Sequence, residues 1–175
     1  MSYSLVPERP GDADLIDPLL DRTFGPERFT KTVYRLREGI RPVPGLSFVA
    51  TGEDEQLLAT LRFWPVLVED AAAILLGPLA VEPRLQGRGI GKALVRHGLI
   101  EAKRRGHALC LVVGDVSYYQ PYGFQAAMPR GFMLPGPVDP PRFQFLDLRP
   151  GASEEIRGLV RRDESAADDA LRQRA

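Results

Sequence analysis

A turn with glycines at three alternate positions, 87, 89 and 91, constrains the fold of this 175-residue chain more than any other feature. The apolar residues 73–81 precede the turn and have the composition of a strand that is buried on both faces. From Gly91 to Ala102, apolar residues recur at the spacing of one helix face, and Gly106 is placed to end that helix. A second apolar stretch, residues 108–113, follows. This order predicts a β-α-β unit whose two strands pair in parallel or nearly so.

The segments around this unit are predicted from apolar spacing and from turn residues. Two helices are expected upstream, one that begins at Asp12 or Asp14 and ends at Gly25, and one over residues 27–38. Pro18 falls early in the first helix, at about its first turn, where proline is tolerated. Further strands are predicted over residues 3–6, 46–51, 56–64 and 142–148.

The length of the chain suits one domain with one hydrophobic core. We expect that domain to cover residues 1–150. Residues 151–175 carry many charges, and we predict a tail that is helical or partly disordered. Ile156, Leu159 and Val160 would share one side of such a helix.

Composition and charge exclude several classes of protein. Lysine and arginine number 23 together, as do aspartate and glutamate, so no overall basic field favours nucleic acid. The longest apolar run, residues 71–81, is about half as long as a membrane-spanning helix. The first ten residues lack a basic start and an apolar stretch, so we expect a cytoplasmic protein. The single cysteine, Cys110, lies in an apolar run and is predicted to be buried and unreactive.

The glycine turn has the properties of a site for a phosphate group. The first amides of a helix lack partners within the helix, and the helix dipole adds partial positive charge. A P-loop would need serine or threonine after Gly91-Lys92, where the chain has Ala93. The dinucleotide fingerprint would need a third glycine at Lys92. Both patterns therefore fail at a position that carries function.

A third pattern, Gln/Arg-x-x-Gly-x-Gly/Ala, fits without a mismatch at Gln86, Gly89 and Gly91. It is the pattern of the GNAT superfamily of N-acetyltransferases, which the chain resembles on both sides of the turn. Upstream, residues 76–83 resemble the strand that leads into the turn in these enzymes. Downstream, residues 114–124 resemble their tyrosine-containing segment that ends in Gly-Phe. The chain is most similar to the YhbS-like branch of predicted acetyltransferases.

The resemblance implies a fold and a donor substrate. The fold would be α/β (α+β), with a mostly antiparallel central sheet, a parallel β-α-β cofactor unit and helices on both faces. The donor would be acetyl-CoA, whose pantetheine arm would pair with the backbone of Leu79, Ala80 and Val81. Its pyrophosphate would bind the residues of the turn, where Arg88 and Lys92 add positive charge. The turn residues in this role are Gln86, Gly87, Arg88, Gly89, Ile90, Gly91 and Lys92.

The resemblance also implies direct attack of an amine on the thioester, without a covalent enzyme intermediate and without a metal. Tyr119 matches the tyrosine that commonly serves as general acid, since it lies four residues before the glycine of Gly-Phe. A tyrosine is protonated at neutral pH and can donate a proton. An asparagine often precedes this tyrosine in the family, whereas the polar residues here are Asp115 and Ser117. Tyr118 and Tyr122 are predicted to serve as packing residues.

No residue is nominated as the general base. The carboxylates considered are Glu82, Asp115 and, through water, Glu69, and each is better explained as a solvated surface group. His97 and His107 are expected to be structural or exposed.

The acceptor is expected to be a small-molecule or peptide amine. In this fold the first two helices and their loop usually select it, and the side chains there are Phe24, Glu27, Arg28 and Phe29. We expect no nucleic-acid partner and no membrane, and a homodimer is compatible with the resemblance. The alternative function is a non-catalytic GNAT-like sensor or regulatory subunit that binds acyl-CoA.

Overall fold

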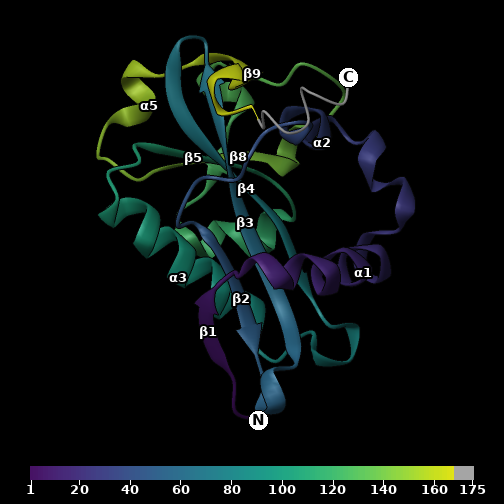
Figure 1. Cartoon of the computed structure of the whole chain (residues 1–175). Helices are drawn as coiled ribbons and strands as arrows, with labels where there is room; N and C mark the ends of the chain where they lie inside the picture. The colour runs from purple at the N-terminus through teal and green to yellow at the C-terminus, as the bar shows by residue number, and fades with distance from the viewer. Residues whose placement is uncertain (168–175) are drawn as a thin grey trace.

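The computed structural model describes residues 1–167 of the chain (Figure 1). The strands in this part form one sheet in the order β1-β2-β3-β4-β5-β8-β6, and β9 pairs with both β3 and β7. Every pair along that order is antiparallel except β4 and β5, which are parallel and joined by α3. The mixed, mostly antiparallel sheet with a parallel β-α-β unit is therefore confirmed. The strands are β1 Ser4–Pro7, β2 Ser47–Thr51, β3 Leu57–Val68, β4 Ala71–Val81, β5 Leu109–Val113, β6 Gln125–Ala126, β7 Phe132–Met133, β8 Phe143–Asp147 and β9 Gly158–Arg162.

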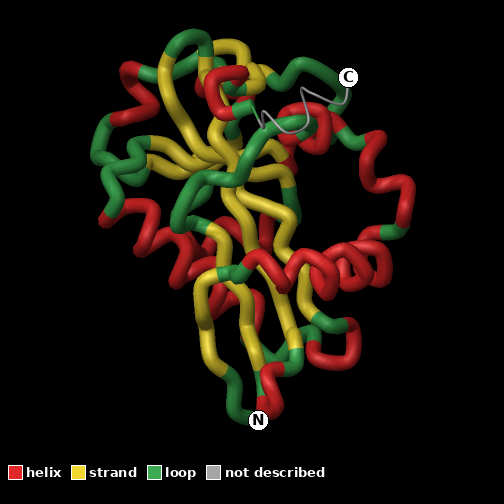
Figure 2. The backbone as a smooth tube through the Cα atoms, viewed as in Figure 1, coloured by secondary structure: helices red, strands yellow, loops and turns green. Residues whose placement is uncertain are grey.

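Helices cover both faces of the sheet (Figures 1 and 2). Side chains alternate along a strand, and in β2 this sends Phe48 and Ala50 into the core under α3 and Val49 into the core under α1. The two helices therefore bury opposite faces of the same strands. The α-helices are α1 Ala13–Phe24, α2 Thr32–Arg37, α3 Ile90–Arg104, α4 Val116–Tyr119 and α5 Ala152–Glu155.

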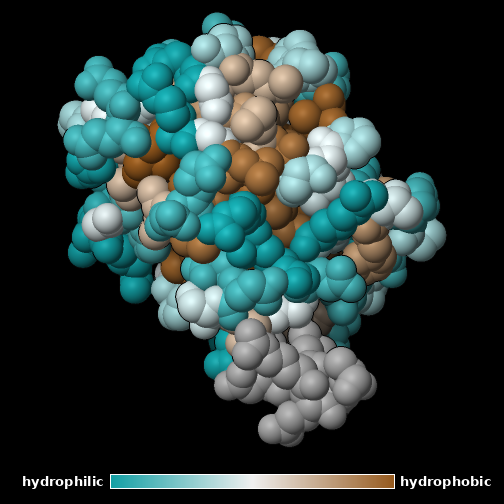
Figure 3. Space-filling model, turned by 90° about the horizontal axis from the view of Figure 1, so that it is seen from above, coloured by the Kyte–Doolittle hydropathy of each residue, from teal (hydrophilic) through white to brown (hydrophobic). Residues whose placement is uncertain are grey.

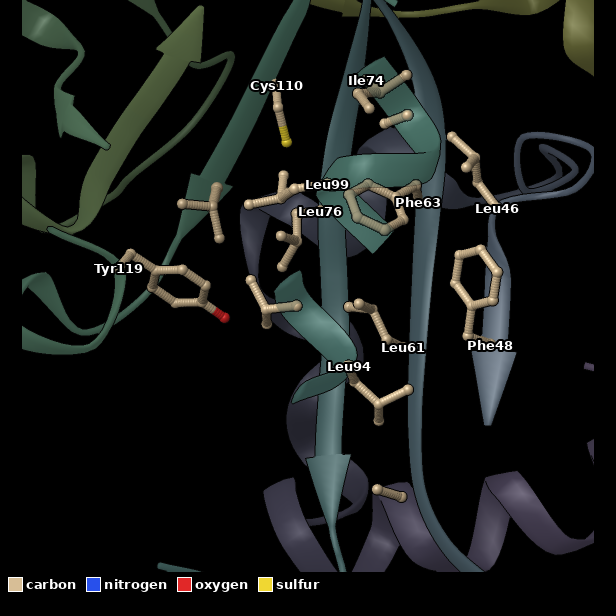
Figure 4. Close-up of a cluster of buried hydrophobic side chains, with 14 of the residues drawn as sticks. Leu46, Phe48, Leu61, Phe63, Ile74, Leu76, Leu94, Leu99, Cys110 and Tyr119 are labelled. Atoms are coloured by element: carbon tan, nitrogen blue, oxygen red, sulfur yellow. The ribbon is translucent and has the colours of Figure 1, made fainter. Parts of the chain in front are cut away.

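The packing of α3 on the sheet is close because the helix carries a glycine where it crosses β3. A Cβ atom on Gly98 would lie 2.6 Å from Cε2 of Phe63, well inside contact distance. Phe63, Leu94 and Leu99 meet there in a core that extends to Cys110 and Tyr119 (Figure 4). The helix α3 is thus packed on the sheet from Ile90 to Ala102.

The region before β2 differs from the expectation in two ways. The helix predicted over residues 27–38 is interrupted, since a 3₁₀ turn at Pro26–Thr30 precedes α2 and Lys31 between them is extended, with ψ 144°. Pro18 lies in the second turn of α1 rather than at about its first. It is exposed there, so water can reach the carbonyl that loses its hydrogen bond.

The chain beyond residue 150 also differs from the expected tail. Residues up to 167 form the short helix α5 and then β9, which adds to the sheet beside β3 from Val68↔Val160 to Val66↔Arg162. Ile156 and Val160 are buried, which fixes this segment to the same core as β7 and β8. Figure 3 shows the surface at the top of Figure 1, where hydrophobic residues lie near the centre and hydrophilic residues surround them. The rest of the predicted tail, residues 168–175, lies outside the described residues.

No helix within residues 1–167 is long and apolar enough to cross a membrane.

Candidate active site

The glycine turn joins β4 to α3 in a conformation that depends on glycine. Gly87 and Gly89 have φ angles of +78° and +88°, in the left-handed region that other residues avoid. Gly89 is the N-cap of α3, and the first hydrogen bond of the helix runs from the amide of Ala93 to its carbonyl, at 3.0 Å. The amides of the helix residues before Ala93 therefore have no acceptor within the helix. These amides are hydrogen-bond donors that remain available to a ligand at the N-terminus of α3.

Gly91 brings the start of α3 against the end of β4. A Cβ atom at this position would lie 2.8 Å from the hydroxyl oxygen of Tyr118 and 3.2 Å from Cγ2 of Val81. The absence of a side chain thus allows the helix, the strand and α4 to meet. Arg88 and Lys92 are exposed beside this point and can approach an anion there.

The edge of β4 that faces β5 is paired over only a short length. Register pairs between the two strands are Ile74↔Cys110 and Leu75↔Leu111, and β4 continues to Val81 with a partner only on its β3 side. Its pairing with β3 shifts register between Leu61 and Phe63, where β4 has the two residues Gly77-Pro78 against one residue of β3. Among the described residues, no strand hydrogen-bonds to the β5-facing edge at Leu79, Ala80 and Val81. An extended ligand can add to such an edge as a further strand.

A cavity of about 460 Å³ lies where β4 and β5 diverge. Its wall is formed by α2, the middle of β4, the end of β5, α4 and the segment 134–142. Leu79 and Tyr119 line it, so the unpaired edge of β4 and the tyrosine segment share one space. A volume of this size suits a small molecule.

Tyr119 is held in this wall by ring contacts. Its ring meets the rings of Tyr118 and Phe124 at centroid distances of 5.0 and 5.6 Å, and a side chain on Gly114 would overlap it. Only 7% of the residue is exposed, and burial raises the pKa of its phenol above the usual value. The phenol oxygen points from the β5 side of the molecule toward β4 (Figure 4). Tyr119 is therefore a neutral, protonated group at the cavity.

The three carboxylates considered as bases already have structural partners. Glu82 forms an ion pair with Arg22 at 2.5 Å, and Glu69 accepts a hydrogen bond from the amide of Leu159 at 2.8 Å. Asp115 lines the cavity but caps α4, and its hydrogen bonds from Ser117 lower its pKa. Of the three, only Asp115 reaches the cavity.

The two histidines lie away from the cavity wall. The ring of His97 packs edge-on against Phe48, with centroids 4.7 Å apart. Burial lowers the pKa of His107, which borders a separate hollow beside residues 163–167.

The expected acceptor region is only partly at the cavity. Phe24 lines it, whereas Phe29 is 63% exposed and Arg28 is buried in an ion pair with Asp21. The structure adds residues that the sequence reasoning missed, above all Arg37 of α2 and Arg142, which follows a proline-rich loop. Neither belongs to a motif, and the tertiary fold alone brings α2 and residue 142 to the middle of β4 and the end of β5.

Comparison with known proteins agrees with this geometry. Residues 44–126 match the family model of the acetyltransferase (GNAT) domain. The N-acetyltransferase YhbS of Escherichia coli K12 is 34% identical over 155 residues, covering 87% of this chain and 92% of YhbS.

Solved structures show the same relationship. The crystal structure of YhbS from Escherichia coli in complex with CoA superposes with a TM-score of 0.80 and 32% identity, over 93% of this chain and 90% of that one. A GNAT family acetyltransferase from Brucella melitensis in complex with acetyl-CoA gives a TM-score of 0.68 and 30% identity, over 94% and 97% of the two chains. With the glycine turn, the partly paired β4 and the tyrosine segment in one site, this chain belongs to the GNAT family of N-acetyltransferases.

Proposed function

We propose that this protein transfers an acetyl group from acetyl-CoA to a primary amine by direct attack on the thioester. The observation that carries the proposal is the arrangement of the site: the glycine turn follows the unpaired edge of β4, and Leu79 on that edge lines the same cavity as Tyr119. The two similar structures that hold CoA or acetyl-CoA support this choice of donor.

The donor fits this path from its phosphates to its acyl group. The pyrophosphate would accept hydrogen bonds from the first amides of α3, with Arg88 and Lys92 adding charge. The pantetheine arm would extend along Leu79, Ala80 and Val81 as an added strand. That course leads the thioester toward the cavity that Tyr119 lines.

The chemical step then needs little from the protein beyond orientation and one proton. The amine nitrogen forms a bond to the thioester carbon, the bond between carbon and sulfur breaks, and its electron pair leaves with the sulfur. Tyr119 would donate its proton to that sulfur, because burial keeps the phenol protonated. An α-amine titrates near pH 8, so enough of it is neutral to attack without a base. The proton that its nitrogen loses on forming the amide would pass to solvent, and the Tyr119 phenolate would take back a proton from solvent.

The proposal is tested by calorimetric titration with acetyl-CoA, followed by an assay of CoA release with a panel of amines. We expect a dissociation constant of about micromolar order, equivalent to roughly 8 kcal/mol, and release of CoA that depends on the amine. Binding without turnover of any amine would instead favour the acyl-CoA sensor. Absence of binding by the folded protein would contradict the donor site altogether.

Cys110 provides a check on direct attack, because it is the one thiol in the sequence and belongs to the same core cluster as Tyr119. It is fully buried, and burial raises the pKa of its thiol far above the usual value. We expect Cys110→Ala to keep kcat within about twofold and to lower the free energy of unfolding by ~1–2 kcal/mol through the small cavity that it creates. Turnover and urea unfolding measure the two effects.

Two results would contradict direct attack by the amine. An acetylated Cys110 in the mass spectrum of the working enzyme, or loss of turnover in the alanine variant, would show a covalent intermediate.

A further inference from the structure

The cavity wall contains a buried cation that no side chain neutralises. Arg37, the last residue of α2, is 8% exposed and lines the cavity. Its Nε is buried without a hydrogen-bond partner, and no carboxylate among the described residues forms an ion pair with its guanidinium. Burying an unpaired charge is costly unless a ligand or another group compensates for it. Among the described residues, the guanidinium therefore has no anionic side chain as a partner.

Aromatic rings and the backbone hold the guanidinium in place. It lies 4.9 Å from the ring centroid of Tyr34 and 5.9 Å from that of Trp64. A Cβ atom on Gly77 would come within 2.8 Å of its Nη2, so the group rests directly on the irregular part of β4. Trp64 is fixed in turn, because its Nε1 donates to the carbonyl of Gly77 at 2.6 Å. Arg37 is thus preorganised and has only a small reorganisation to make on binding an anion.

The guanidinium stays charged in this position. Burial lowers the pKa of Arg37 to about 10, and the neighbouring phenol of Tyr34 opposes that effect. A group with this pKa is still protonated at neutral pH.

An anion bound at Arg37 would be distinct from the donor pyrophosphate. Gly77 precedes Val81 by four residues, and at about 3.3 Å per residue the two lie about 13 Å apart along β4. The glycine turn follows Val81, whereas Arg37 lies at the other end of the unpaired edge. Tyr119 shares the cavity with Arg37. A ligand beside Arg37 is therefore at the end of the path where transfer would occur.

The other charges of the lining also favour an anion. Asp115 is engaged by Ser117, as described above, and Asp139 is the remaining acidic residue of the lining. The cations of the lining are Lys31, Arg37 and Arg142.

Building on the proposed function, we propose that Arg37 binds the anionic group of the acceptor, which is a small primary amine carrying a carboxylate or a phosphate. A guanidinium presents two parallel N–H donors that match either group. The cavity of about 460 Å³ has room for a small molecule of this kind. The same buried charge disfavours polyamines and other acceptors that carry only positive charge.

The test uses pairs of acceptors that differ only in the anion. Amino acids are compared with their amides, and phosphoethanolamine with ethanolamine, by following CoA release from acetyl-CoA. We expect the wild-type protein to favour an anionic member at least about tenfold in kcat/KM, which is about the effect of one charge-assisted hydrogen bond. In Arg37→Gln the KM for that member rises at least about tenfold more than the KM for its neutral partner.

Two control variants isolate the role of the charge. Arg35→Gln removes an exposed cation from the same helix, outside the cavity wall, and should leave the preference unchanged. Arg37→Lys keeps a positive charge without the planar fork, and it should retain part of the preference even if Arg37→Gln fails to fold. Calorimetry with acetyl-CoA should give the wild-type dissociation constant for each folded variant.

Each outcome decides the matter. Preference for an anionic amine that Arg37→Gln abolishes supports the inference, and the two pairs tell carboxylate from phosphate. The inference would be overturned if the wild-type protein used neutral and anionic amines equally, or if Arg37→Gln lowered kcat/KM equally for both members of a pair. It would also be overturned if a protein that binds acetyl-CoA turned over no member. Failure to bind acetyl-CoA would instead be the failure of the proposed function.

Discussion

Gly89→Glu is expected to weaken acetyl-CoA binding at least about a hundredfold, a loss of roughly 2.8 kcal/mol. The new carboxylate would stand before the free amides of α3, where the donor pyrophosphate is proposed to bind, and would repel it. Glutamate would also have to adopt the left-handed φ of +88°, which adds backbone strain. Calorimetric titration with acetyl-CoA measures the change.

Gly106→Glu is the matched control for this variant. Gly106 lies at the other end of α3, is exposed and has a φ of +85°, and a Cβ atom on it would meet no heavy atom within 4 Å. It therefore suffers the same backbone strain and gains the same charge, away from the proposed donor site. We expect both variants to lose similar thermal stability and only Gly89→Glu to lose the donor. Equal donor affinities for the two variants would contradict the assignment of the turn to the pyrophosphate.

Tyr119→Phe is expected to lower kcat by about 10² to 10⁴, the usual contribution of a positioned general acid. The dissociation constant for acetyl-CoA should stay within about twofold, because the ring and its contacts with Phe124 are kept. Single-turnover measurements at saturating donor separate this chemical effect from binding and product release.

Tyr122→Phe is the control for the loss of a phenol in the same tyrosine cluster. Tyr122 donates to the carbonyl of Lys92 at 3.4 Å and does not line the cavity, so its loss should leave kcat unchanged. Wild-type kcat in Tyr119→Phe would mean that water, rather than Tyr119, protonates the departing sulfur.

The raised pKa of Tyr119 predicts the pH dependence of this step. Burial favours the neutral phenol, so the pKa in the folded protein lies above the usual value near 10 and the acid form persists to higher pH. We expect no fall in kcat that depends on Tyr119 below about pH 10. A decline centred near pH 8 that is absent from the phenylalanine variant would contradict this assignment of its pKa.

The sequence by itself determined those parts of the structure that depend on interactions between residues close together in the chain. Apolar spacing, together with glycines that only certain turns require, indicated the β4-α3-β5 unit to within a few residues. The resemblance carried by Gln86, Gly89, Gly91 and the segment ending at Phe124 then indicated the family, which the comparisons confirm.

The limits of that reasoning appear where long-range packing outweighs local preference. Charge density predicted a helical or partly disordered segment beyond residue 150. The free edge of β3 instead pairs with β9, and the core buries Ile156 and Val160. The helix expected over residues 27–38 is interrupted at Lys31. Arg37, at the end of the shorter helix α2, then lines the cavity.

Tertiary structure alone decided which side chains line the cavity that we propose for the acceptor. Arg37, Trp64 and Arg142 are far apart in the sequence and match no motif, and the geometry of the diverging β4 and β5 brings Arg37 and Arg142 to one cavity. The donor side could be predicted from the sequence because the donor is proposed to bind a backbone turn, and such a turn requires closely spaced glycines. The acceptor side depends on side chains from separate elements, whose meeting is fixed only when the whole core packs.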